Sequence, residues 1–324
     1  MKVGLTGATG HVGTNLCRML TEEGYTVRVL IHNDDKGLTG LPLEMVPGNI
    51  LNIQDLIRLT KGCDVVFNLA ASITIYRHDV SSHQLNVESC RNLIEASAIT
   101  GVKRIIHFSS IHAFRQEPLN SELNEIRELA LKSNSSYDSS KALGQTMMLK
   151  ASSDEMEVVV LNPTAIVGPN DFKPSLLGNA IIRFYKGQNP GLIPGGYDWV
   201  DVRDVCKAAV NAINKGSGGE CYLLPGSWQS LEILAEEISG QGGHRPPRLH
   251  FPGWLAQFGT PFLNIHARLI RKPPLYTSIS LETLKHSHQN ISGEKARLAL
   301  DFNPRPFEET IADTVKWFKE NKYI

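Results

Sequence analysis

The sequence contains few cysteines and carries no net charge, and each of these features excludes some classes of protein. Five cysteines occur in 324 residues and none belongs to a CxxC pair, so we expect free, buried thiols in a reducing compartment. Lys plus Arg and Asp plus Glu both number 33. This balance leaves no basic field to attract nucleic acid or an anionic membrane surface, so a small molecule is the expected partner.

Long apolar segments are missing as well. No apolar run reaches the ~18 residues that span a bilayer, and no basic and apolar leader precedes the first strand pattern. The cysteine spacing suggests no metal site either. We therefore expect a cytoplasmic protein with no membrane attachment and no bound metal.

Strand and helix patterns alternate through the first half of the sequence. Residues 2–6 and 26–31 are rich in β-forming residues, and between them residues 12–23 have apolar side chains at helical spacing. Further strand-like runs cover residues 64–69, 103–108, 157–161 and 220–224. Strands that alternate with helices predict an α/β fold built on a doubly wound parallel sheet.

A glycine-rich turn, TGATGHVG at residues 6–13, stands between the first predicted strand and the first helix. Gly7 permits a tight turn, Gly10 lets the backbone approach a pyrophosphate, and Gly13 lets helix and strand pack closely. The helix N-terminus favours the anion. The expected dinucleotide contacts in this turn are Gly7, Thr9, Gly10, His11, Val12 and Gly13.

The composition of the sequence changes after about residue 165, where proline and glycine become frequent. A chain of this length also exceeds what one hydrophobic core usually supports. We expect a dinucleotide-binding Rossmann domain over residues 1–165, with 200–225 returning to its sheet. A smaller, mostly helical substrate lobe would comprise 166–199 and 226–324, including an apolar helix over 254–271 that faces the core or a dimer partner.

Tyr137 and Lys141 in the segment YDSSK lie one helical turn apart, so they face the same side of a helix predicted to run to about Lys150. An ammonium beside a phenol favours the phenolate, which predicts a pKa of Tyr137 below its reference of about 10. Ser109 and Ser110 end a predicted parallel strand, at the sheet edge that faces ligands. Ser110 is the expected catalytic hydroxyl and Ser109 its structural neighbour.

Together these motifs resemble the extended short-chain dehydrogenase/reductase family, also called the NAD-dependent epimerase/dehydratase family. Matching pieces cover nearly the whole chain: NLAA at 68–71, LNV at 85–87, NPT at 162–164 with GP at 168–169, and WVDVRDV at 199–205. The segment NPTAIVGPNDFKPS, residues 162–175, is most similar to the dihydroflavonol-4-reductase-like branch, which includes aldehyde and ketone reductases.

The resemblance implies a catalytic triad of Ser110, Tyr137 and Lys141, with Tyr137 as proton donor in reduction and Lys141 also touching the nicotinamide ribose. It implies a homodimer through helices near residues 81–100 and 139–151. The further cofactor contacts that it implies are Asn49, Ile50, Leu69, Ala70, Ala71, Ser109, Pro163 and Thr164. The substrate contacts that it implies are Arg77, His112, Phe172 and Lys173.

Ile31 and His32 stand at the end of the second predicted strand, where an acid normally binds the ribose of NAD. The missing acid argues against strict NAD use, and His32 takes a place where reductases of this branch often carry Arg. Both His32 and Lys36 can bind a phosphate. We expect NADP as the preferred cofactor, with NAD as the alternative.

Dehydratases of this family place an acid beside the catalytic serine or threonine, whereas this chain has Ile111 and His112. The main hypothesis is therefore NADPH-dependent reduction of an aldehyde, ketone or dihydroflavonol-like carbonyl. A nucleotide-sugar epimerase with retained NAD is an alternative, and a non-catalytic dinucleotide-sensing protein is another. Four late cations could supply the charge that a nucleotide sugar needs: Arg268, Arg271, Lys272 and Arg305.

Overall fold

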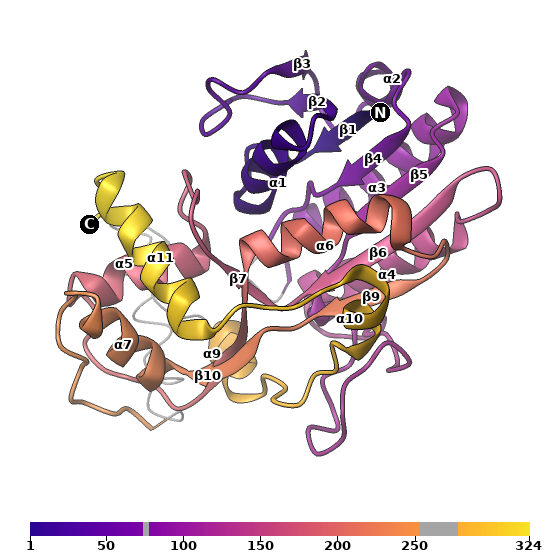
Figure 1. Cartoon of the computed structure of the whole chain (residues 1–324). Helices are drawn as coiled ribbons and strands as arrows, with labels where there is room; N and C mark the ends of the chain where they lie inside the picture. The colour runs from indigo at the N-terminus through magenta and orange to yellow at the C-terminus, as the bar shows by residue number, and fades with distance from the viewer. Residues whose placement is uncertain (74–77, 253–277) are drawn as a thin grey trace.

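A seven-stranded sheet forms the larger part of the computed structural model, which describes residues 1–73, 78–252 and 278–324 (Figure 1). The strand order is β3-β2-β1-β4-β5-β6-β9, and every pairing in this sheet is parallel. The chain reverses its winding between β1 and β4, which is where such sheets bind ligands. The strands are β1 (Lys2–Thr6), β2 (Thr26–Ile31), β3 (Leu43–Pro47), β4 (Val65–Asn68), β5 (Arg104–Phe108), β6 (Glu157–Pro163) and β9 (Cys221–Leu224).

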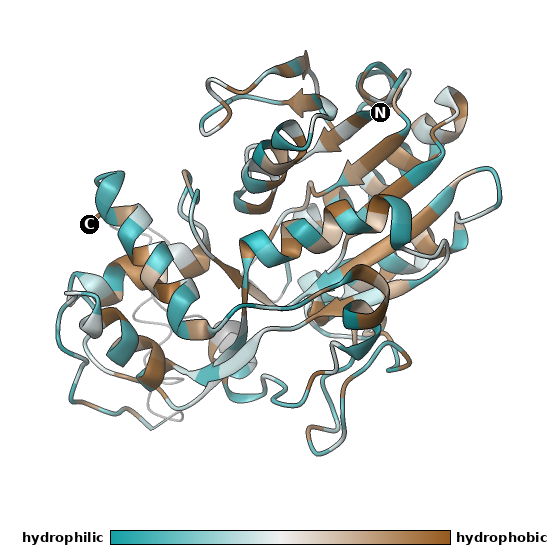
Figure 2. Ribbon diagram, viewed as in Figure 1, coloured by the Kyte–Doolittle hydropathy of each residue, from teal (hydrophilic) through white to brown (hydrophobic). Residues whose placement is uncertain are grey.

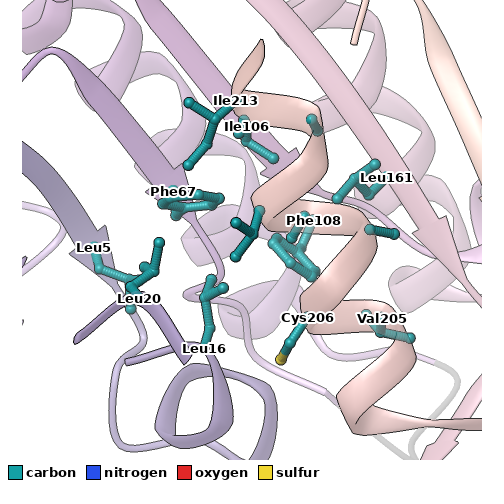
Figure 3. Close-up of a cluster of buried hydrophobic side chains, with 14 of the residues drawn as sticks. Leu5, Leu16, Leu20, Phe67, Ile106, Phe108, Leu161, Val205, Cys206 and Ile213 are labelled. Carbon is teal, nitrogen blue, oxygen red and sulfur yellow. The ribbon is translucent and has the colours of Figure 1, made fainter. Parts of the chain in front are cut away.

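Helices cover both faces of this sheet, as the sequence predicts for a doubly wound fold (Figure 1). The helices α1 (His11–Glu22) and α6 (Val202–Lys215) pack together on one face. On the other face lie α2 (Ile53–Thr60), α3 (Val80–Thr100) and α4 (Ser136–Lys150). Each face buries its own apolar cluster, and Figure 3 shows Leu16, Leu20 and Cys206 meeting Phe67 and Phe108 of the sheet on the α1 side.

A second, smaller body continues from the carboxyl end of β6. Its three strands, in the order β10-β8-β7, are β7 (Ala165–Val167), β8 (Gly196–Asp201) and β10 (Ser227–Ser230). Its apolar cluster is separate and includes Trp199, Phe184 and Phe307. Figure 2 shows the apolar residues of α5, α7 and α11 gathered where these helices meet. The helices of this body are α5 (Leu176–Tyr185), α7 (Leu231–Gly240), α9 (Ser278–Lys285) and α11 (Phe307–Glu320), whereas α10 (Glu294–Leu300) packs against α6 and β9 of the larger body.

Six strands and the two helices that carry the motifs occur where the sequence predicts them. Strands β1 and β2 have the predicted bounds, α1 begins within one residue of its predicted start, and α4 ends at Lys150 as predicted. The sequence analysis does not predict β3 or the three strands of the small sheet. Strands β3, β7 and β10 are short and only partly buried, and β8 is buried but carries Asp198 and Asp201 in place of an apolar run. The expected helix over 254–271 lies outside the described residues.

The described ranges contain no helix long and apolar enough to cross a membrane. All five cysteines are free and buried, as the scattered spacing predicts.

Candidate active site

The glycine turn between β1 and α1 is packed too closely for any side chain. Gly7 has a φ of 71°, and a Cβ added to it would lie 2.7 Å from the backbone nitrogen of Ala70, in the loop after β4. A Cβ added to Gly13 would lie 2.2 Å from the carbonyl oxygen of Gly7. The turn, the start of α1 and the loop after β4 therefore meet at distances that only glycine permits.

The N-terminus of α1 is left open to a ligand. Gly10 caps this helix without a side-chain hydrogen bond, and no acidic residue occupies the first turn. By contrast, α2, α3 and α4 are capped by the side chains of Asn52, Asp79 and Ser135. Uncapped N–H groups above a glycine-rich turn are what a dinucleotide pyrophosphate needs, so these residues fit that group.

The side chain of His11 faces the smaller body rather than the turn. Its Nε2 lies 3.0 Å from the carbonyl oxygen of Pro169, and Asn15 Nδ2 donates to the same oxygen over 3.0 Å. Asn170 Nδ2 then donates to Asn15 Oδ1 over 3.0 Å. The first turns of α1 are thus fixed to residues 169–170.

Ser110, Tyr137 and Lys141 come together at the carboxyl end of β5. The Ser110 hydroxyl lies close enough to Tyr137 to lower the pKa of its phenol. Lys141 Nζ donates to the carbonyl oxygen of Phe108 over 2.7 Å, and Lys141 is only 6% exposed. Ser135 caps the N-terminus of α4, so the first turns of this helix carry both Tyr137 and Lys141.

The pKa of Tyr137 is not lowered as the sequence spacing predicts. Burial raises the pKa of this phenol to about 12. The Ser110 hydroxyl lowers the pKa in part, and the Asp138 carboxylate raises it further. The prediction was wrong because it counted the nearby ammonium and not the burial. At neutral pH Tyr137 is therefore a neutral phenol, which is the form that donates a proton.

Burial also affects Lys141, in the opposite direction. It lowers the pKa of the Lys141 ammonium to about 8, and the neighbouring Cys90 thiol opposes this shift. Among the residues that the structure describes, no carboxylate pairs with this ammonium, which donates to the carbonyl of Phe108. A buried, unpaired ammonium is costly to stability and is characteristic of functional sites.

A chain of buried polar groups crosses the edge of the sheet beneath the turn. Thr6 Oγ1 accepts from the backbone nitrogens of Leu69 and Ala70 and donates to Asn68 Oδ1 over 2.9 Å. The Asn68 amide nitrogen therefore faces His107 Nδ1, 3.1 Å away. Since Nδ1 must accept this bond, the proton of neutral His107 lies on Nε2.

His107 remains neutral. Burial and the nearby Lys141 ammonium hold its pKa well below the ordinary value. It lines a cavity of about 10 Å³, enough for one water, together with Ala70, Ala71, Asn86, Cys90, Ser140, Lys141 and Gly144. Sequence analysis did not identify His107 and Asn68 as site residues. The signal that could have found them is a polar residue at the last or next-to-last position of an otherwise apolar strand.

Further buried polar groups lie behind Ser110. Asn162 Nδ2 donates to the carbonyl oxygen of Ser110 over 2.9 Å and to Gln145 Oε1 over 2.7 Å. Ser109 Oγ is buried without a hydrogen-bond partner among the described residues. The structure thus holds the Ser110 backbone firmly and leaves one hydroxyl beside it for a ligand.

The loop after β2 contacts the smaller body. His32 is exposed at the end of β2, and Lys173 Nζ pairs with Asp34 at 2.7 Å. Phe172 packs against Gly37, where an added Cβ would lie 2.7 Å from its ring. Phe172 and Lys173, expected at the substrate, are thus joined to the loop that follows β2.

Several other predicted residues have structural partners. Asn49 Oδ1 accepts from the backbone nitrogen of Leu51 over 2.9 Å, and Thr164 N donates to Leu224 O over 3.4 Å. Arg305 pairs with Asp204 at 2.8 Å and Glu309 at 3.2 Å, so its charge is already neutralised.

Two further predicted residues belong to the sheet and its packing. Ile50 packs against the apolar cluster under α2, and Pro163 ends β6. Outside the described residues lie Arg77, Arg268, Arg271 and Lys272.

No group of His, Cys, Asp and Glu side chains within the described ranges is arranged to hold a metal ion. The chemistry available at this edge is therefore that of a phenol, a hydroxyl, an ammonium and imidazoles around an open helix N-terminus.

Comparisons with known proteins agree with this geometry. Residues 3–224 match the model of the NAD dependent epimerase/dehydratase family. The chain is 30% identical over 326 residues to "Sterol demethylase protein B" of Methylococcus capsulatus, covering 99% of both chains. It is 30% identical to a Synechocystis protein named "Putative dihydroflavonol 4-reductase", covering 99% of this chain and 95% of that one. The crystal structure of gox2253 superposes with a TM-score of 0.85 at 27% identity, covering 100% and 99% of the two chains.

Proposed function

Since the chain belongs to the NAD dependent epimerase/dehydratase family of enzymes, we propose that it is an NADPH-dependent reductase of an aldehyde, ketone or dihydroflavonol-like carbonyl. The observation that carries the proposal is the group formed by Ser110, Tyr137 and Lys141 beside the open N-terminus of α1. The name of the Synechocystis relative supports a carbonyl of the dihydroflavonol type.

In this proposal each residue of the group has one task. When bound, the nicotinamide cofactor supplies the hydride. Tyr137, kept neutral by burial, donates its proton to the carbonyl oxygen, and Ser110 hydrogen-bonds the same oxygen. Lys141 binds the nicotinamide ribose and keeps its positive charge near the phenolate as the proton leaves.

The remaining cofactor contacts that we propose lie in the segments that follow β1, β4 and β5, at the carboxyl edge of the large sheet. The uncapped turn from Gly7 to Gly13 would hold the pyrophosphate. The loop after β4, with Leu69, Ala70 and Ala71, would pass the ribose and phosphates, since it touches both Gly7 and Lys141. The unpartnered hydroxyl of Ser109 would serve the nicotinamide side.

NADPH consumption with a panel of aldehydes, ketones and dihydroflavonols tests the proposal. We expect turnover with at least one class of carbonyl, and a loss of 100-fold or more in Tyr137→Phe, because general acid catalysis contributes roughly 10² to 10⁴. The variant should keep its dinucleotide-induced thermal shift. Turnover of a nucleotide sugar without net cofactor change would instead identify an epimerase, and stabilisation by dinucleotide without any turnover would identify a sensor.

We further propose that NADP is preferred over NAD. No acid ends β2, His32 is exposed there, and Lys173 neutralises the Asp34 carboxylate that would otherwise repel a 2′-phosphate. Dissociation constants of the two cofactors test this preference. Tighter binding of NAD than of NADP by the purified protein would contradict it.

We also propose a division into two lobes and a homodimer. Residues 1–165 with 200–225 would bind the dinucleotide, and 166–199 with 226–324 the substrate. The separate apolar clusters support this division except at residues 296–302, which pack into the cluster of the large sheet. The dimer would form through α3 and α4, which pack against each other. Light scattering that gives a mass near 35.8 kDa would exclude the dimer.

A further inference from the structure

We propose that His112, held by Asp138, returns a proton from solvent to Tyr137 after each reduction. This inference rests on the proposed reductase function, because it concerns the proton that Tyr137 gives to the carbonyl oxygen. It assigns to His112 a task different from the substrate contact expected from the sequence.

His112 lies beside Tyr137, and both side chains are partly exposed. The rings of His112 and Tyr137 meet edge to face, with their centroids 5.9 Å apart. His112 Nδ1 lies 3.5 Å from Asp138 Oδ1, and the two side chains are 28% and 27% exposed. Because Nδ1 faces the carboxylate, Nε2 is the nitrogen left to exchange a proton with water and with the phenol.

Local structure keeps the imidazole in this place. Ser110 caps the short turn Ile111–Ala113 by accepting from the backbone nitrogen of His112 over 3.2 Å. Ser133 Oγ donates to Asp138 Oδ2 over 3.2 Å, which orients the carboxylate. Asp138 and Tyr137, both from α4, are the ionisable side chains recorded in contact with His112 in the described structure.

The other ionisable groups described at this site, Lys141 and His107, are buried. Lys141 is 6% exposed and His107 is 4% exposed. The Lys141 ammonium is bound to the carbonyl of Phe108, and His107 is a neutral donor of fixed tautomer. A proton that enters from bulk water therefore meets His112 before it meets Lys141.

The proton balance requires such a donor. The hydride of NADPH forms a C–H bond at the carbonyl carbon, and the C=O π electrons move to oxygen, which takes the proton of Tyr137. The alcohol leaves with that proton, so the phenolate must regain one. In our proposal the imidazolium of His112 protonates the phenolate, directly or through one water, and the neutral imidazole then takes a proton from solvent. No electrons are exchanged in this return step.

Single-turnover and steady-state NADPH oxidation separate this task from a structural one. In His112→Ala, we expect the first turnover to stay within about twofold of wild type, since Tyr137 starts protonated, while steady-state kcat falls tenfold or more. Millimolar imidazole should restore most of the lost kcat. Asp138→Asn, which removes the carboxylate beside His112, should likewise lower steady-state kcat while leaving the first turnover near that of wild type.

A matched control is available on the surface. His286 also pairs with a carboxylate, Glu117, with His286 Nδ1 3.4 Å from Oε1, and His286→Ala should leave both phases unchanged. The inference is overturned if kcat of His112→Ala equals that of wild type, or if both phases fall together and imidazole restores neither. If wild type and His286→Ala reduce no carbonyl at all, the proposed function itself is wrong.

Discussion

Lys141 is the residue that most directly ties ionisation to activity. Its ammonium is buried, and burial lowers its pKa to about 8, whereas Tyr137 stays protonated up to about pH 12. As pH rises, the ammonium is therefore lost first, and with it the charge that stabilises the phenolate. We expect the reduction rate to be level below pH 8 and to fall above it, which a pH profile of kcat would check.

A conservative change supplies the control for that profile. Lys141→Arg keeps its charge far above pH 8, so any activity that the variant retains should lack the fall. A profile that keeps the same fall in this variant would assign the ionisation to another group.

The same burial makes Lys141 a cost to folding. At pH 7 the native state holds an ammonium whose pKa is about 8, while in the unfolded chain that pKa is 10.5. The native state loses its proton first as pH rises, so its stability increases between pH 8 and 10.5. Lys141→Met should therefore be inactive and yet more stable at pH 7, by about 1 to 3 kcal/mol after the lost bond to Phe108 is counted.

Urea unfolding of Lys141→Met at pH 7 and at pH 10 would check this expectation. The advantage should shrink at the higher pH, where the native lysine is already neutral. An equal or lower free energy of unfolding at pH 7 would contradict it.

At the scale of elements, α1 depends on one small residue. A Cβ at Gly13 would stand 2.2 Å from the backbone oxygen of Gly7, and backbone cannot move aside as a flexible side chain does. We expect Gly13→Ala to lower the free energy of unfolding by about 3 kcal/mol or more and to abolish the thermal shift caused by dinucleotide.

Gly240, at the end of α7, is the matched control for that change. An added Cβ there meets nothing within 4 Å, so Gly240→Ala should stabilise the protein by up to about 1 kcal/mol. Thermal unfolding of both variants, with and without NADP, distinguishes a packing conflict from a general effect of alanine. Similar shifts in the two variants would refute the packing explanation.

The sequence predicts elements well where burial is continuous. Strands β1 and β2 and helix α1 are recognisable because their apolar residues follow one period. The small sheet escapes prediction because β7 has three residues and β10 is nowhere fully buried. Its strands form through pairing with β8, which is information that no local pattern contains.

The site divides in the same way. Ser110, Tyr137 and Lys141 can be found from spacing within one strand end or one helix turn. The tautomer of His107 and the pairing of His112 with Asp138 depend on contacts between separate elements. The pKa of Tyr137 moves against the expected direction for the same reason, since its burial is a property of the folded chain.

At the scale of the whole molecule, the smaller body reaches the loop that we propose for cofactor choice. Lys173 pairs with Asp34 in that loop, and the hydroxyl of Tyr323 donates to Phe172 O over 2.7 Å. Lys173→Ala would leave the Asp34 carboxylate uncompensated. We expect the variant to bind NADP several-fold more weakly while its affinity for NAD changes less, because only NADP carries the 2′-phosphate.

Calorimetric dissociation constants for both cofactors would measure this difference. Arg297→Ala removes an equal charge from an exposed pair with Glu294 on α10 and should change neither constant. An equal loss of affinity for NAD and NADP in Lys173→Ala would contradict this expectation, because it would show that the substitution acts by changing the shape of the loop and not its charge.

Residues 169–173 touch α1 through Pro169 and Asn170 and touch the loop after β2 through Phe172 and Lys173. These five residues precede α5 in the chain, yet they buttress both ends of the dinucleotide site that we propose. A chimera that joins this nucleotide-binding half to the lobe of a relative should therefore place its junction after Lys173 and not at the end of β6. Lobes exchanged at the earlier point would bring foreign residues to the cofactor as well as to the substrate.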